Sequence, residues 1–278
     1  MALNIQTNVA SLEAQRSVAR NQKALTGSFN KLASGYRVNS AADDAAGLAI
    51  SESMKSQIRS FTVAERNAAD GISMAQTAEG GLSEIHNVLG RMRELAMQSS
   101  NGSLTSADRD YLNNEFTSLQ GEITRIQGST KFNGSDLISS GAASTVTFQV
   151  GLNNAANDQI QVAFNNIDLS GATNAANAKV SGTDNANALT ALSSIDTAIA
   201  AVSKQRSGFG AAMNKLGVAS NNIQTMKLNI SAANSRIVDV DVAQETASMA
   251  RNQVLTQAGI SVLAQANQLP QFAMNLIG

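Results

Sequence analysis

The chain has 278 residues, of which 43% are hydrophobic and only 4% aromatic, and its net charge is -1. It contains no Cys, which excludes disulfides, thiolate metal sites and cysteine nucleophiles. The near-zero charge argues against a nucleic-acid-binding protein, which needs a strong positive field. Because no apolar run of about 18 residues occurs, we expect no membrane insertion.

The N-terminal segment, residues 1–33, has apolar side chains at helical spacing and is predicted to form a helix. Residues 1–6 lack the basic region and apolar stretch of a secretory signal, so we expect no cleavable signal peptide. Asp43 and Asp44 precede the next apolar segment, and we expect Asp43 to cap the helix that begins there. The apolar positions of the first helix are Leu3, Ile5, Val9, Leu12, Leu25, Phe29 and Leu32.

A second apolar stripe runs without a gap from Met54 to Ala96 and predicts one long helix. Its average spacing is about 3.5 residues, which is the period of coiled coils. Residues 99–102, which read Ser-Ser-Asn-Gly, are expected to end this helix. The stripe consists of Met54, Ile58, Phe61, Ala64, Ala68, Ile72, Ala75, Ala78, Leu82, Ile85, Leu89, Met92 and Ala96.

Thr105 and Asp108 have the spacing of a capping box and are expected to start a shorter helix, which Gly128 closes. The apolar period then changes to two, which predicts a β-hairpin with one buried face at about 145–165. The alternating residues are Val146, Phe148, Val150, Ile160, Val162 and Phe164. Residues 170–188 are rich in Ala, Asn, Ser, Thr and Gly, and are predicted to form a loop at the tip of the molecule.

A third long helix is predicted from Leu189 to Ile237, where apolar residues again recur every three to four positions with one break at Arg206. Residues 239–278 are also expected to be helical, with Pro270 kinking or ending the helix locally. The apolar positions of this last segment are Val254, Ile260, Leu263, Leu269, Phe272 and Leu276.

No residue after Arg251 is charged. A loose terminal tail is one interpretation, but disordered segments usually combine high charge with low hydrophobicity. This tail is neutral and half apolar, so we favour a self-assembly element whose apolar face needs a partner surface. The partner is either the N-terminal helix of the same chain or the tails of other copies.

The sequence offers no cluster for catalysis, a cofactor or a metal. His86 is the only His and has no evident partner, and the adjacent Asp43 and Asp44 do not face each other on a helix. Gly80-Gly81 lacks the strand and the lysine of a phosphate-binding loop. We therefore expect a protein that is not an enzyme and that binds no cofactor or metal.

Two long motifs at opposite ends of the chain carry a family resemblance. Residues 30–51 read Asn-Lys-Leu-Ala-Ser-Gly-Tyr-Arg-Val-Asn-Ser-Ala-Ala-Asp-Asp-Ala-Ala-Gly-Leu-Ala-Ile-Ser. Residues 235–241 read Ser-Arg-Ile-Val-Asp-Val-Asp, and residues 257–268 read Gln-Ala-Gly-Ile-Ser-Val-Leu-Ala-Gln-Ala-Asn-Gln. Together with the Asn-Ile-Gln-Thr-Asn of residues 4–8, they strongly resemble the signatures of bacterial flagellins.

The resemblance implies a mainly α, elongated coiled-coil bundle with a small β-hairpin region and helical termini. Residues 1–43 with 237–278 would form a terminal domain at the inner core of a helical filament, and residues 44–236 would form a rod around it. The chain resembles a minimal flagellin without large outer domains. Export through the flagellar type III apparatus would place it outside the cell, in the filament that drives motility.

The implied partners are other flagellin copies, an export chaperone, the filament cap and the hook–filament junction proteins. A junction adaptor of the flagellum is the alternative function. By the same resemblance, Arg91, Leu95 and Glu115 match the contacts of a vertebrate Toll-like receptor, and residues 30–51 match a peptide sensed by plant receptors. Because Arg91 and Leu95 are four residues apart, we expect both to be accessible beside the buried stripe.

Overall fold

The computed structural model describes residues 7–139, 144–174 and 178–277, with the side chains of 269–277 left out. Contacts divide the chain into two compact units. The terminal unit comprises Met1–Ile58 and Leu228–Gly278, and the central unit comprises Arg59–Lys227. The secondary structure is mainly helical with two small strand pairs, which confirms the predicted fold class.

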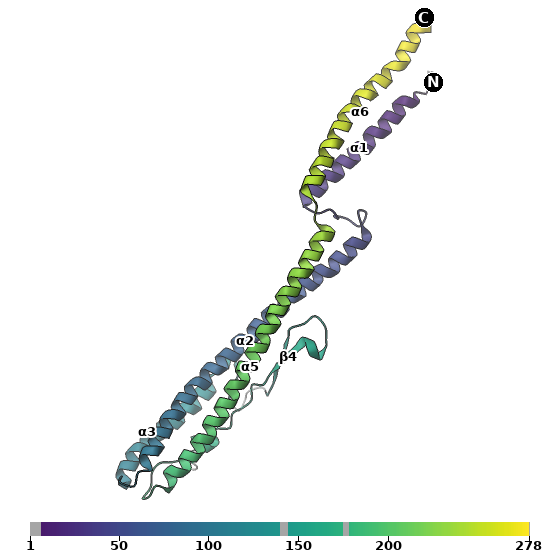
Figure 1. The fold of residues 1–278 in the computed structure, drawn as a ribbon. Coiled ribbons are helices and arrows are strands. Elements are labelled where there is room, and N and C mark those ends of the chain that lie inside the picture. Colours follow the sequence, from purple (N-terminus) through teal and green to yellow (C-terminus); the bar gives the residue numbers. More distant parts are fainter. Residues whose placement is uncertain (1–6, 140–143, 175–177, 278) are drawn as a thin grey trace. The chain divides into compact units, whose positions relative to one another are not determined.

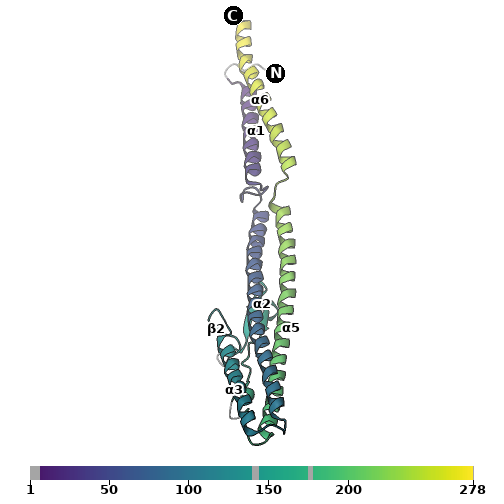
Figure 2. The ribbon, with the colours of Figure 1, turned by 90° about the vertical axis from the view of Figure 1, so that its left-hand side faces the viewer.

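The terminal unit is built on an antiparallel pair of helices, α1 (Val9–Ser34) and α6 (Val242–Ile277). Figures 1 and 2 both show the two helices side by side. The side chain of Asn8 caps α1 by accepting a hydrogen bond from the Ser11 N–H. Gly35 ends α1 with a φ of 75°, a left-handed conformation in which glycine is not strained.

The segments that follow α1 and precede α6 are hydrogen-bonded to each other. The Arg37 N–H donates to the Val238 carbonyl at 2.6 Å, and the Val240 N–H donates to the Gly35 carbonyl at 3.0 Å. Val38 and Val238 are both buried. The two chain segments that flank the helix pair therefore hold each other in place.

Helix α2 (Ala45–Ser99) is capped by Asp44, so the expectation that Asp43 caps it is wrong. Oδ1 of Asp44 accepts from the Gly47 N–H at 2.9 Å. Asp43 lies one residue too early and instead closes the preceding turn, where its carboxylate accepts three hydrogen bonds from Ser40 and Asn39. These bonds to Ser40 and Asn39 lower the pKa of Asp43.

In the central unit, the second apolar stripe of the sequence forms the core. From Phe61 to Ala96 its side chains are buried apart from a half-buried Ile72. Helix α5 (Ala186–Val238) lies along α2 within this unit (Figures 1 and 2). Three ion pairs join the two helices at the edge of the core: Glu79–Arg206, Glu65–Lys227 and Arg93–Asp196.

Helix α3 (Ser106–Ser129) begins with the predicted capping box, since both the Thr105 and the Asp108 side chain accept the expected backbone N–H. The prediction that Gly128 closes it is wrong, because the helix continues to Ser129 and Thr130 forms its C-cap. The buried side of α3 carries Phe116, Ile123 and Ile126.

The predicted hairpin is present as β3 (Val146–Gln149) and β4 (Gln159–Val162), which pair antiparallel with Phe148 opposite Ile160. A short 3-10 helix, η1 (Ala156–Asp158), lies in the connection. The hairpin packs on the helices where Gly71 leaves room: a Cβ there would lie 3.1 Å from the Phe148 ring. A second, two-residue pair, β1 (Lys131–Phe132) with β2 (Ser135–Asp136), follows α3.

Residues 170–188 are not simply a loop. Helix α4 (Ser170–Thr173) lies at their start, and α5 already begins at Ala186. The buried side chain of Gln120 donates hydrogen bonds to the carbonyls of Ala172 and Ala178, both at 2.9 Å. The amide of Gln120 therefore satisfies two backbone carbonyls that burial removes from water. This allows the small residues of the segment to pack closely against α3.

Arg109 holds the end of α2 in the central unit. Its side chain is only 3% exposed, and Nε donates to the Ser99 carbonyl at 3.0 Å. Nη2 donates to the Asn101 carbonyl at 3.2 Å, and Nη1 reaches the Gly182 carbonyl at 3.5 Å. A cation at a helix C-terminus is favourable, because the last carbonyls carry partial negative charge.

Candidate self-assembly surface

The large apolar side chains of α1 point outward from the terminal unit. Val9, Leu12 and Phe29 are 61%, 53% and 63% exposed. Leu25 and Leu32 are half-buried. The periodicity that predicted the helix therefore describes a face that the chain itself leaves largely in water.

Helix α6 shows the same arrangement. Val254 and Ile260 are 64% and 53% exposed, and Leu263 is half-buried. Leu255 and Val262 are also exposed, although the spacing argument did not single them out. These two residues could have been predicted from their position in the uncharged stretch after Arg251.

Small residues make the contact between α1 and α6. Ser11 and Ser28 are the buried residues of α1, and Ala266 is buried on α6. Gly259 permits the close approach, since a Cβ there would lie 2.8 Å from Cγ2 of Val18. The two helices thus pair through small side chains, and this pairing leaves the large apolar ones outside.

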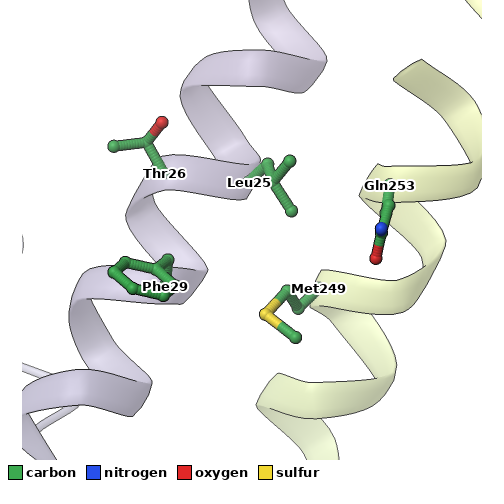
Figure 3. A pocket seen from close by; sticks show the side chains of 5 residues that line it. All are labelled: Leu25, Thr26, Phe29, Met249 and Gln253. Atoms are coloured by element: carbon green, nitrogen blue, oxygen red, sulfur yellow. The ribbon is translucent and has the colours of Figure 1, made fainter. Parts of the chain in front are cut away.

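A groove of about 360 Å³ lies between the two helices and is lined mainly by apolar atoms. In Figure 3, Leu25 of α1 and Met249 of α6 point toward each other across it, beside the exposed ring of Phe29. Thr26 and Gln253 complete the lining without adding charge. The groove offers a concave site to an apolar side chain of another molecule.

Five of the predicted assembly residues cannot be placed. Leu3 and Ile5 lie outside the described residues, as do the side chains of Leu269, Phe272 and Leu276. The backbone at position 270 is described, and α6 continues to Ile277. Of the two predicted effects of Pro270, ending the last helix is therefore wrong, and a local kink stays a prediction.

The three residues matched to a receptor site lie in the central unit. Nε of Arg91 donates to Oε1 of Glu115 at 2.9 Å, and Nη1 pairs with Glu94 at the same distance. The carboxylates of Glu115 and Glu94 raise the pKa of Arg91. Leu95 is only 1% exposed, so the expectation that it is accessible is wrong. It faces the core because the apolar stripe on α2 is wide enough to include it.

The part of the chain that the structure describes contains no group of three or more acidic or His side chains that could hold a metal ion. No helix in the described ranges is long and apolar enough to cross a membrane. The shifted pKa values belong to helix caps, a turn and ion pairs, such as Asp108 at the start of α3, Asp43 in the turn before α2 and Glu122 beside Arg125.

The arrangement of the terminal unit is typical of one class of protein. Two helices that leave uncharged apolar faces in water are expected in a subunit that buries those faces against further copies of itself. The fold and the surface thus define a helical subunit of a homopolymer.

Comparison with known proteins gives the family. Residues 5–143 match the bacterial flagellin N-terminal helical region, and residues 192–277 match the bacterial flagellin C-terminal helical region. A flagellin of Halalkalibacterium halodurans is 44% identical over 273 residues, which cover 98% of this chain and 99% of that protein. The chain therefore belongs to the bacterial flagellin family and is a structural subunit of the extracellular flagellar filament.

Solved structures agree with this assignment at the level of the fold. The crystal structure of Bacillus cereus flagellin is 31% identical, with a TM-score of 0.50 over 61% of this chain and 94% of that chain. A putative flagellar hook-associated protein from Vibrio parahaemolyticus has a TM-score of 0.60 over 71% of this chain and 100% of that chain. Its sequence identity is 17%, so this second likeness shows the fold alone.

Proposed function

We propose that the terminal helices drive polymerisation of this flagellin by burying their apolar faces against neighbouring copies. The observation that carries the proposal is the exposure of Val9, Leu12, Phe29, Val254 and Ile260 on two helices that already pair with each other. Pairing within the chain does not cover these side chains, so only other molecules can.

The energetics favour coupling between folding and assembly. Ordering the backbone costs about 1–2 kcal/mol per residue, whereas burying a large apolar side chain contributes about 1.5–3 kcal/mol. In a free chain, the α1–α6 pair buries few large side chains. We therefore propose that the two terminal segments become stably helical only when neighbouring copies cover them.

Limited proteolysis of the soluble chain tests this coupling. We expect a protease to remove residues before about 44 and after about 236 and to leave the central unit intact, because its core is buried. The same segments should resist the protease in sedimented filaments. Equal resistance of the terminal segments and the central unit in the soluble chain would show that assembly is not needed to order them.

We propose the following arrangement of the chain in the filament. Residues 1–43 with 237–278 form the inner core around a channel, and residues 44–236 form the surrounding shell. Each copy presents one surface to a different surface of the next, a heterologous contact that yields an open helical polymer.

Export and assembly require further partners. We propose that the chain leaves the cell through the flagellar type III apparatus, accompanied by a chaperone on its C-terminal helix. The filament cap and the hook–filament junction proteins are its partners at the two ends of the filament. Its role in the filament is structural, and we propose that it catalyses no reaction.

Seeded polymerisation separates a filament subunit from a junction adaptor. Purified chain added to short filament seeds should elongate them, as seen by electron microscopy, because each added copy offers a new surface to the next. An adaptor would bind the seed ends once and stop. The likeness to a hook-associated protein concerns the fold and does not favour the adaptor.

A Toll-like receptor is a proposed host partner. The exposed pair of Arg91 and Glu115 offers a cation and a carboxylate on adjacent helices, with side chains 50% and 46% exposed. Leu95 supports this site from the core rather than touching a receptor. A reporter-cell assay should show weaker receptor activation by Arg91→Ala than by Arg125→Ala, whose side chain lies on the same unit in a comparable surface ion pair.

A further inference from the structure

Pro270 leaves one carbonyl of α6 without its usual donor. In an α-helix the N–H of each residue donates to the carbonyl four positions earlier, and proline has no N–H. The carbonyl concerned belongs to Ala266, which is only 6% exposed. Since α6 runs unbroken from Val242 to Ile277, this buried acceptor needs a hydrogen bond from elsewhere.

The donor comes from the other end of the chain. Nδ2 of Asn8 donates to the Ala266 carbonyl at 2.7 Å, while Oδ1 of the same side chain accepts from the Ser11 N–H at 3.1 Å. Oγ of Ser11 in turn donates to Oδ1 of Asn267 at 2.7 Å. Asn8 thus caps the start of α1 and fills the gap that Pro270 opens in α6.

We propose that this cluster, which we call the proline lock (Asn8, Ser11, Ala266, Asn267 and Pro270), sets the register of α1 against α6. Apolar contacts between helices tolerate a slip along the axis, whereas buried polar groups lose their partners. Other carbonyls in the interior of α6 have N–H groups four residues later, so the carbonyl ahead of Pro270 is the one left available to the amide of Asn8.

A fixed register has a consequence for assembly. The outward faces of α1 and α6 form one composite surface only if the two helices pair in a single alignment. A slip of one turn, about 5.4 Å, would displace Val254 and Ile260 relative to Leu12 and present a different surface to the next copy. This role of the lock goes beyond the proposed function, because it identifies the contact that selects one composite surface. It rests on the proposed function, in which the helices become ordered on assembly.

Disulfide trapping can read the register, because the natural chain has no Cys. A Cβ at position 259 would lie 4.0 Å from Cβ of Val18, within the range of about 3.5–4.5 Å that a disulfide requires. The pair Val18→Cys with Gly259→Cys therefore reports the native register. The pair Val18→Cys with Leu263→Cys reports a slip of one turn. Filaments are sedimented, mildly oxidised, dissolved and analysed for intramolecular cross-links.

The informative variants are Asn8→Ser and Pro270→Ala. Serine keeps the helix cap but cannot reach Ala266, whereas alanine returns an N–H to position 270. We expect Asn8→Ser to lower the ratio of native to slipped cross-link by about threefold to tenfold, the worth of one hydrogen bond. In the Pro270→Ala background, Asn8→Ser should lower the ratio much less, since the restored N–H at position 270 already supplies a donor to the Ala266 carbonyl. Ser17→Ala, which loses only a bond within α1, is the matched control.

Two results would overturn the lock. The first is a cross-link ratio that Asn8→Ser leaves unchanged. The second is an equal fall in the cross-link ratio in the unaltered chain and in the Pro270→Ala background, which would mean that Asn8 acts through α1 alone. Failure of the 18–259 pair to cross-link in otherwise unaltered filaments would instead refute the pairing of α1 with α6 in the proposed function. If Asn8→Ser chains do not polymerise alone, a small share of them is incorporated into filaments of unaltered copies, and the same ratio is measured.

Discussion

Replacing Phe29 by alanine should weaken the filament without weakening the free chain. The ring is 63% exposed at the edge of the groove between α1 and α6. A Phe side chain offers roughly 200 Å² of surface, so about 120 Å² remains for a neighbouring copy to cover. At about 25 cal/mol per Å² this burial contributes about 3 kcal/mol per subunit, of which alanine keeps a small part.

The measurable consequence is a higher critical concentration for polymerisation. A loss of about 2 kcal/mol corresponds to a factor of about 30, since about 1.4 kcal/mol is tenfold. Critical concentrations are obtained by sedimentation at several protein concentrations, with Ser17→Ala as the control on the same helix. Thermal unfolding of the soluble chain should be unchanged. An unchanged critical concentration for Phe29→Ala would refute the reasoning, and a lower unfolding temperature would mean that the free chain already buries the ring.

Three further predictions concern other contacts. Arg109→Met should lower the free energy of unfolding of the central unit by about 3 kcal/mol in urea, because three carbonyls lose a charged donor. Gly259→Ala should raise the critical concentration, because its Cβ would meet Cγ2 of Val18 at 2.8 Å, and Val18→Ala should restore it. Glu65 has a pKa lowered from 4.5 by hydrogen bonds from its two partners on α5. Because its folded pKa lies below the unfolded one, its contribution to stability is present above about pH 4.5 and is lost as the pH falls through the folded value. Glu65→Gln should therefore make the free energy of unfolding depend less steeply on pH between the folded and the unfolded pKa of Glu65. An unchanged pH dependence would contradict the role of this carboxylate.

Local features of the sequence were sufficient for most of the secondary structure. The capping box of Thr105 and Asp108 and the alternation around Phe148 and Ile160 depend on neighbours a few residues away or on a two-residue period. The family motifs at both ends and the uncharged stretch after Arg251 likewise identified the self-assembling class of protein before any contact was known.

Contacts between distant segments decided the rest. Pro270 does not end α6, and the carbonyl it frees is bonded by Asn8, which lies 258 positions from Ala266 in the sequence. Leu95 is buried although its spacing placed it beside the stripe. Asp44 rather than Asp43 caps α2, because the turn that contains Asn39 and Ser40 occupies the Asp43 carboxylate.

The sequence by itself thus determined where helices and the hairpin form and predicted that the chain ends need a partner, because these follow from periodicity, charge and local hydrogen bonding. Only the tertiary structure decided which side chains stay in water and which polar groups satisfy each other across α1 and α6. The physical reason is that burial and hydrogen-bond satisfaction depend on residues brought together by the fold, and no local pattern specifies which distant residue supplies the missing donor.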